Sequence, residues 1–122
     1  SYALPLNGTL VKTEKEPTVY FIKNGLKFPV TAQIFRQRQF KFFDVKVVSF
    51  AELHSWITGS FLSPVEGTVV KNTSGRSLYW VVSETFYQIN GQFIKDKGIQ
   101  RFPQLAMTDK DINGFAKGEK LY

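Results

Sequence analysis

Short apolar segments separated by polar turns run along the chain and predict a series of brief β-strands. Val19–Lys23 and Leu78–Val82 combine aromatic with branched aliphatic residues, a composition typical of strands. Asn24-Gly25 follows the first of these and precedes Leu26–Val30, which predicts a hairpin because a type I′ turn needs positive φ at both central residues. Ser83-Glu84 follows the second strand instead, so we expect its hairpin to turn differently.

Further strands and short helices complete the predicted pattern. Helical turns are expected where a residue that can cap a helix precedes apolar residues at helical spacing. Ser49-x-x-Glu52 has the form of a capping box, in which each side chain satisfies a backbone N–H of the other residue. The shorter strands are predicted at Thr9–Lys12, Thr68–Lys71, Val45–Val48 and Gln104–Met107, and the helical turns at Thr31–Arg38, Asn90–Lys97 and after Ser49 and Thr108.

The chain aligns with itself at an offset of 59 residues without a gap, which gives ten identities. Composition by itself predicts roughly three or four. Several replacements also keep their character, as where Phe21 meets Trp80, Trp56 meets Phe115 and Arg36 meets Lys95. We interpret residues 1–59 and 60–118 as two copies of one unit, with 119–122 as the start of a further unit or a C-terminal tail.

The predicted fold is therefore α+β and sheet-rich, with two tandem 59-residue repeats of short antiparallel strands and short helices. A unit of about 60 residues is marginally stable by itself, because it buries only about 60% of its unfolded surface. We expect the two units to pack against each other for this reason. The sequence does not indicate whether they share one core.

Composition excludes several classes of protein. The chain has 122 residues, no cysteine and one histidine, which excludes a disulfide framework, a thiolate metal site and a multi-histidine site. No apolar run approaches the roughly 18 to 20 residues that span a bilayer, and the first ten residues do not have the form of a signal peptide. The net charge of +6 favours polyanionic partners in general.

Candidate catalytic and metal-binding groups are few. His54 lies near Ser49, Ser55 and Glu52 in one predicted short helix, and its counterpart in the second unit is Asn113, so we interpret it as a solvated helix residue. Asp109 and its neighbours lack the glycine and terminal glutamate of a calcium loop and are interpreted as a capping cluster. We therefore predict no catalytic residue, no metal and no cofactor.

Basic and aromatic residues are the better candidates for a binding site. Cations alternate with rings in residues 36–43, where Phe40 and Phe43 align with Ile99 and Phe102 and are expected in the core. Phe42 aligns with Arg101 and is expected to be free. A basic residue at a strand end can also guard an exposed sheet edge, and recurring aromatic residues can belong to the core. The candidate binding residues are Lys12, Lys71, Tyr20, Tyr79, Arg36, Arg38 and Phe42.

The units resemble tandem repeats of bacterial cell-surface, surface-layer-associated and secreted proteins. The resemblance rests on GTLVK, VYFIKNG and DVKVVSFAEL in the first unit and on EGTVVK and SLYWV in the second. It implies a noncatalytic extracellular module that binds a cell-wall or glycan polymer or acts as a spacer. The alternative is a subunit of a surface lattice or filament that assembles with neighbouring copies. Nucleic acid is the least favoured partner.

Overall fold

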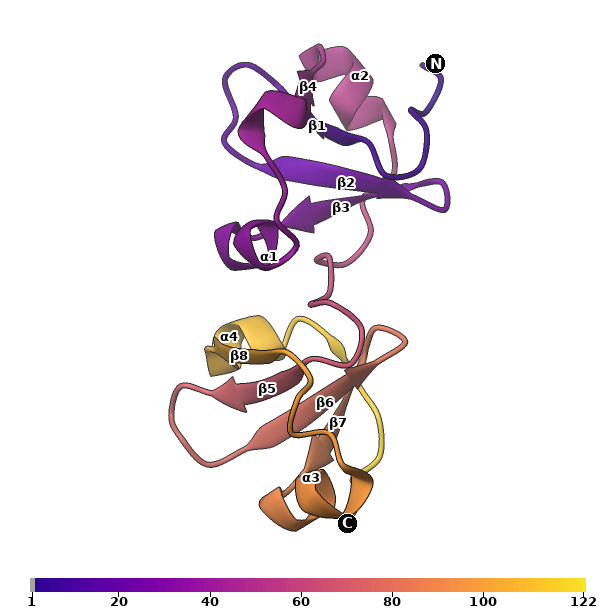
Figure 1. Ribbon diagram of the computed structural model, residues 1–122. Coiled ribbons are helices and arrows are strands. Elements are labelled where there is room, and N and C mark those ends of the chain that lie inside the picture. Colours follow the sequence, from indigo (N-terminus) through magenta and orange to yellow (C-terminus); the bar gives the residue numbers. More distant parts are fainter. Residues whose placement is uncertain (1) are drawn as a thin grey trace. The chain divides into compact units, whose positions relative to one another are not determined.

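Strands and short helices alternate along the chain and form two separate sheets in the computed structural model, which describes residues 2–122 (Figure 1). The fold is mixed α+β and sheet-rich, which confirms the predicted class. The chain divides into two compact units, Ser1–Leu62 and Ser63–Tyr122. That the units pack against each other stays a prediction.

The first unit contains a four-stranded sheet in the order β3-β2-β1-β4. The hairpin strands pair antiparallel as expected, whereas β4 pairs parallel to β1. A strand was predicted here, but the expectation of antiparallel strands was wrong for it, because the strand direction depends on the segment that carries the chain from β3 across the sheet to β4. The strands are β1 (Leu10–Lys12), β2 (Val19–Lys23), β3 (Leu26–Val30) and β4 (Val45–Val47).

The second unit contains a five-stranded sheet in the order β8-β5-β6-β7-β9. Its central hairpin, β6 and β7, lies 59 residues after β2 and β3 with the same strand lengths. β9 has a one-residue counterpart in the first unit, the parallel bridge between Lys27 and Thr58. The strands are β5 (Val69–Asn72), β6 (Leu78–Val82), β7 (Thr85–Ile89), β8 (Gln104–Met107) and β9 (Ala116–Lys117).

The two hairpin turns have the same backbone conformation, so the expectation of a different second turn was wrong. Asn24 and Gly25 have φ values of 51° and 81°, and Ser83 and Glu84 have 49° and 64°. The Ser83 amide donates to the Glu66 carboxylate at 2.9 Å, as the Asn24 amide donates to the side chain of Asn7. This contact and the strand register hold Ser83 and Glu84 at φ values that their local preference disfavours.

The helices begin at the predicted caps. The hydroxyl of Thr31 accepts from the Ile34 amide, and Ser49 and Glu52 form the predicted capping box. The Asn90 side chain accepts from the Phe93 amide in the second unit. The helices are α1 (Ala32–Gln37), α2 (Phe50–Ser55), α3 (Gly91–Lys97) and α4 (Asp109–Ile112), with a 3-10 turn η1 at Phe42–Asp44.

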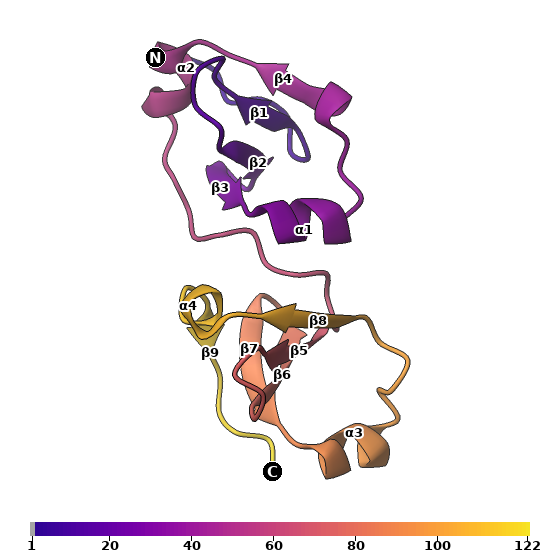
Figure 2. The ribbon, with the colours of Figure 1, turned by 90° about the vertical axis from the view of Figure 1, so that its left-hand side faces the viewer.

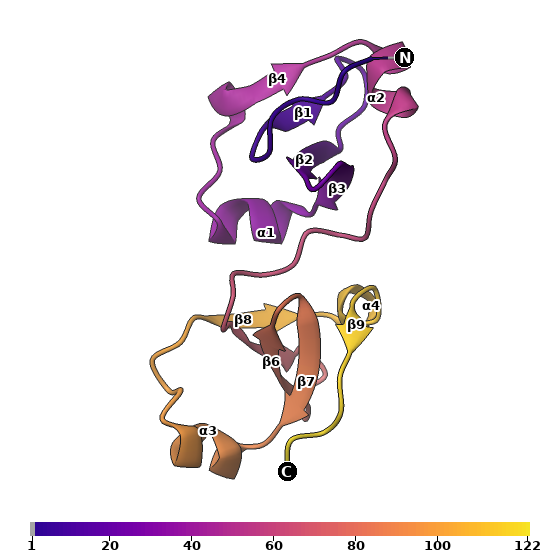
Figure 3. The ribbon, with the colours of Figure 1, turned by 90° about the vertical axis from the view of Figure 1, so that its right-hand side faces the viewer.

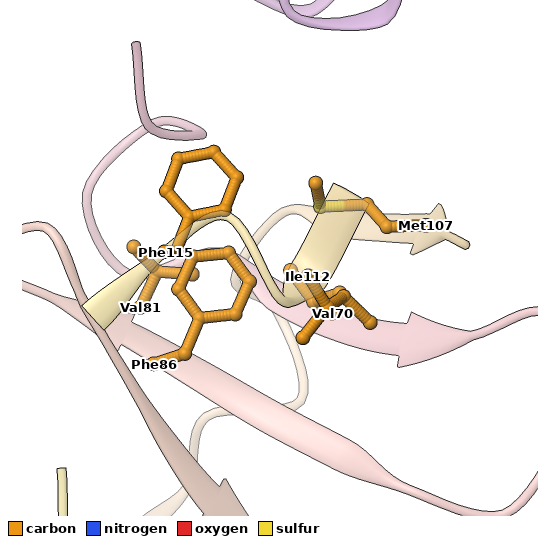
Figure 4. Close-up of a cluster of buried hydrophobic side chains, with 6 residues drawn as sticks. All are labelled: Val70, Val81, Phe86, Met107, Ile112 and Phe115. Carbon is orange, nitrogen blue, oxygen red and sulfur yellow. The ribbon is translucent and has the colours of Figure 1, made fainter. Parts of the chain in front are cut away.

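Each sheet is covered by a helix on either face, as the second unit shows (Figures 2 and 3). Neighbouring residues of a strand point to opposite faces, so Val69 belongs to the cluster under α3 and Val70 to the cluster under α4. In the α4 cluster the rings of Phe86 and Phe115 stack with centroids 4.7 Å apart (Figure 4). The first unit has a matching cluster under α2, which consists of Val11, Ile22, Val48, Leu53 and Trp56.

The segment Glu119–Tyr122 belongs to the second unit. The Leu121 amide donates to the Gln88 carbonyl at 3.0 Å, as the Leu62 amide donates to the Pro29 carbonyl at 2.9 Å in the first unit. The Leu121 side chain packs against the cluster under α3. These residues therefore pack along β7 of the second unit in the way that the residues after Gly59 pack along β3 of the first unit.

Candidate functional site

A hollow of about 260 Å³ lies in the first unit beside α1, where the helix meets η1, the start of β2 and the end of β3. Phe42 in η1 is 74% exposed, and its ring stacks on Phe35 of α1 with centroids 4.6 Å apart and planes inclined at 28°. Arg36, the charged residue of the lining, is exposed in the last turn of α1. The lining consists of Pro17, Val19, Val30, Ala32, Phe35, Arg36 and Phe42.

The chain reaches this arrangement through a sharp turn after α1. Gln39 has a φ of 60°, and the Phe40 amide donates to the Phe35 carbonyl at 3.0 Å. The Phe40 ring then stacks on Phe21 of the sheet at 5.5 Å, which anchors the segment. Phe42 follows two positions later and is placed over Phe35 rather than in the core.

The expectation that Phe43 lies in the core was wrong, because its side chain is 86% exposed. Its counterpart Phe102 is 40% exposed and stacks on Trp80 with centroids 6.0 Å apart. In the first unit Phe40 makes the equivalent contact with Phe21, so no position remains there for the ring of Phe43.

Of the predicted binding residues, the structure brings Arg36 and Phe42 together at this hollow. Arg38 follows as the C-terminal cap of α1 and is half-buried. Tyr20 packs against the cluster under α2, whereas its neighbour Val19 lines the hollow on the other face. Tyr20 therefore lies away from Phe42.

The remaining predicted residues occupy two different settings. Lys12 is half-buried and donates from Nζ to the Thr13 carbonyl at 2.6 Å, and Lys71 is exposed on β5. Both β1 and β5 lie inside their sheets, so the alternative that these lysines guard a sheet edge was wrong. Tyr79 is half-buried against the cluster that contains Phe86.

His54 has a partner that its sequence neighbourhood does not indicate. Its Nε2 lies 3.1 Å from Oε1 of Glu16, which is 38 positions away, and its ring lies 4.0 Å from the ring of Phe50. The hydrogen bond with His54, followed by one from the Thr13 hydroxyl, lowers the pKa of Glu16 below its ordinary value of 4.5. The hydroxyls of Ser49 and Ser55 both contact Glu52 instead of the imidazole.

A second hollow, of about 480 Å³, lies beside this pair. Its walls are the loop of residues 13–16 and the segment from Val47 to Phe50. The side chain of Phe50 is 65% exposed. In the second unit Asp109 stands at the position of Phe50, and its carboxylate accepts from Asn72 and Ser74 of the matching loop. The second unit therefore has hydrogen bonds between its loop and Asp109 at the position where the first unit has a hollow beside Phe50.

A buried lysine is the other feature that the sequence did not predict. Lys27 is 3% exposed and donates from Nζ to the Trp56 carbonyl at 2.6 Å. Burial lowers its pKa below the ordinary 10.5, while the charge of Glu16 acts in the opposite direction. Its counterpart is Phe86, and Lys117 of the second unit donates instead to the carbonyl of Phe115, the counterpart of Trp56, at 2.8 Å. The comparison of the two units is the signal that could have revealed this exchange.

Within residues 2–122, no three His, Asp or Glu side chains gather in a way that could hold a metal ion. The same residues form no helix with the length and apolar character needed to cross a membrane.

Comparisons with known proteins give distant similarities. No protein-family model matches the chain. The chain is similar to Protein CgeD of Bacillus subtilis (strain 168), with 25% identity over 123 residues that cover 95% of this chain and 29% of the relative. It thus spans less than a third of that relative. A chain in the structure of the periplasmic assembly from the ESX-5 inner membrane complex aligns with 95% of this chain and 35% of its own length, at 10% identity and a TM-score of 0.38.

Proposed function

We propose that this chain is a noncatalytic extracellular module of a bacterial surface or secreted protein, and that it binds a cell-wall or glycan polymer through the hollow at Phe42. The observation that carries the proposal is the exposed Phe42 ring, 74% accessible and fixed against Phe35, beside the cation of Arg36. A fixed ring offers flat apolar area to the C–H face of a sugar, and a guanidinium next to it donates to hydroxyl or acidic groups.

Fixation of the ring matters for affinity, because a side chain that is already ordered loses little entropy on binding. The contact with Phe35 orders Phe42 before any ligand arrives. Phe43, the next residue, is 86% exposed and has no ring contact within the described chain. Phe42 is therefore held in place by a ring contact and Phe43 is not, although both are exposed phenylalanines.

Co-sedimentation of the full chain with purified Bacillus cell-wall sacculi tests the proposal. Phe42→Ala is expected to weaken binding by about threefold to tenfold, while circular dichroism stays unchanged. Phe43→Ala is the matched control and is expected to bind like the parent chain. Equal binding by the parent and Phe42→Ala would refute a role for the hollow, and no retention of the parent would refute polymer binding.

The exposed edge of β4 supports a second candidate function, self-assembly as a subunit of a surface lattice or filament. β4 ends its sheet, and Val47 on it is 59% exposed. An apolar edge strand is a template for pairing with another chain, although Lys46 in the middle of β4 is a residue that discourages such pairing. For this reason we rank assembly second. Light scattering across a wide concentration range tests it, since growth in mass that Val47→Lys abolishes would favour assembly over polymer binding.

A further inference from the structure

The larger hollow of the first unit, about 480 Å³ in volume, has an apolar wall and a charged wall. The apolar wall includes Val47 and Phe50, whose side chains are 59% and 65% exposed. The charged wall consists of Glu14, Lys15 and Glu16. Two carboxylates thus stand against one ammonium in this wall, on a chain whose net charge is +6.

The carboxylate of Glu16 is fixed through one of its two oxygens. Oε1 lies 3.1 Å from Nε2 of His54 and accepts from the Thr13 hydroxyl at 2.8 Å. These two hydrogen bonds lower the pKa of Glu16, so the group is ionised at neutral pH. Within residues 2–122, Oε2 of the same carboxylate has no hydrogen bond or salt bridge. It is a charged acceptor that is open to a ligand.

His54 joins the two walls of this hollow. Its Nε2 contacts Glu16 in the charged wall, and its ring lies 4.0 Å from the ring of Phe50 in the apolar wall. A single side chain therefore positions a carboxylate and an exposed aromatic ring at one site. A carboxylate accepts charge-assisted hydrogen bonds from an ammonium, and the face of an aromatic ring attracts the same positive charge.

The second unit satisfies the matching position from within its own chain. Asp109 stands there in place of Phe50. Its carboxylate accepts from Nδ2 of Asn72 at 2.9 Å and from the hydroxyl of Ser74 at 3.1 Å, both in the matching loop. In the first unit the loop carries the carboxylates instead, and the side chains of Val47 and Phe50 offer no donor. The donor for the open carboxylate oxygen must come from outside the chain.

We propose that this hollow binds a primary ammonium group on an apolar stem, with the chemistry of a lysine side chain in a partner peptide. The ammonium donates to Oε2 of Glu16, and the methylenes of the stem pack against Val47 and Phe50. A guanidinium fits less well, because its parallel donors need both carboxylate oxygens and one of them is engaged. An amino sugar fits less well because its ammonium lies directly on a hydroxylated ring. The site shares no lining residue with the hollow at Phe42 and goes beyond the polymer binding proposed above.

An amide NMR titration of the isotope-labelled full chain with Nα-acetyl-L-lysine methylamide tests the inference. Saturable shifts are expected in residues 13–16 and 47–50. Glu16→Gln and Phe50→Ala are each expected to weaken binding by about threefold or more, because one loses the charged acceptor and the other the ring. The control Glu119→Gln removes the same charge from an exposed position of the second unit and is expected to bind like the parent chain.

A reversed effect is expected for Lys15, which is exposed in the charged wall. Lys15→Gln removes a charge of the same sign as the ligand, so it should tighten binding. Weaker binding in Lys15→Gln would mean that the ligand also needs an anionic group, and it would refute a simple ammonium site.

Three other outcomes would overturn the inference and leave polymer binding at Phe42 untouched. Equal shifts with Nα-acetyl-L-norleucine methylamide, which has an apolar stem without the ammonium, would show that the charge is not recognised. Tighter binding of the matching arginine derivative or of glucosamine would refute the stated chemistry. Absence of saturable shifts in the parent chain, or equal affinity of Glu16→Gln and Glu119→Gln, would refute the site.

Discussion

Replacement of Lys27 by methionine tests whether the buried ammonium is needed to satisfy the carbonyl of Trp56. Methionine keeps the apolar stem of the side chain and removes the donor that lies 2.6 Å from that oxygen. A buried carbonyl without a donor costs about 1–3 kcal/mol. Part of this loss is offset, because the lowered pKa of Lys27 shows that burial already disfavours its charged form. We expect Lys27→Met to destabilise the first unit by about 1–2 kcal/mol.

The second unit indicates which substitution should restore a donor to the Trp56 carbonyl in Lys27→Met. There the ammonium comes from Lys117, whose counterpart is Thr58, and it contacts the carbonyls of Ile112 and Phe115 at 2.6 and 2.8 Å. Thr58 is exposed and bridges to Lys27, so a lysine at position 58 approaches the same helix end from outside. Lys27→Met/Thr58→Lys is therefore expected to recover at least half of the lost stability. Thr58→Lys by itself is expected to give no gain, because the carbonyl already has a donor.

Urea unfolding followed by tryptophan fluorescence measures these effects in the first unit. The chain has two tryptophans, one in each unit, so a Trp80→Phe background leaves Trp56 as the reporter. The four combinations at positions 27 and 58 form a double-mutant cycle whose coupling term isolates the shared carbonyl. The reasoning is refuted if Lys27→Met is as stable as the parent, or if Thr58→Lys stabilises both backgrounds equally.

Two further predictions concern the loops that connect the first two strands of each unit. Asn72→Ala removes three accepted amide hydrogen bonds and the donation to Asp109, so we expect the second unit to lose roughly 2–3 kcal/mol in urea unfolding. Its counterpart Thr13→Ala should lose less, and equal losses would contradict the role given to Asn72. His54→Ala should raise the pKa of Glu16 toward 4.5 in a carboxyl carbon NMR titration, by more than Thr13→Val does, because the histidine hydrogen bond is the larger cause. Since the folded-state pKa is lowered, the stability contributed by Glu16 is present above pH 4.5 and is lost as the pH falls through the lowered value, so a larger shift in Thr13→Val would reverse the assignment.

The glycines shared by the two units show why a sequence identity does not reveal its own cause. Gly8 and Gly67 have φ values of 91° and 83°, a conformation that favours glycine. Gly59 and Gly118 have no such φ and are required for a different reason. A Cβ at Gly59 would lie 2.8 Å from Cε1 of Phe28, and Tyr87 covers Gly118 in the same way. The identities were evident from the alignment, whereas the two reasons required coordinates.

Local interactions determined most of what the sequence could predict. Strand composition, the Asn24-Gly25 turn and the Ser49–Glu52 capping box act between residues that are close in the chain, so their pattern is sufficient to predict these elements. The interval of 59 residues allowed each element to be placed twice. The exposure of Phe42 could also be predicted, because its replacement by Arg101 in the second unit excludes a shared core position, whereas its contact with Phe35 could not.

Only the tertiary structure decided the contacts that join distant residues. The exposure of Phe43 depends on Phe40 having occupied the place on Phe21, and the conformation of Ser83 depends on Glu66. The partner of His54 and the exchange of Lys27 for Lys117 likewise depend on which strand lies beside which helix. Such contacts join residues that are far apart in the sequence, and their free energy depends on how the strands and helices pack. No short stretch of the chain therefore predicts them. The sequence by itself therefore determined the elements and their repetition, and the packing of those elements decided which side chains remain exposed.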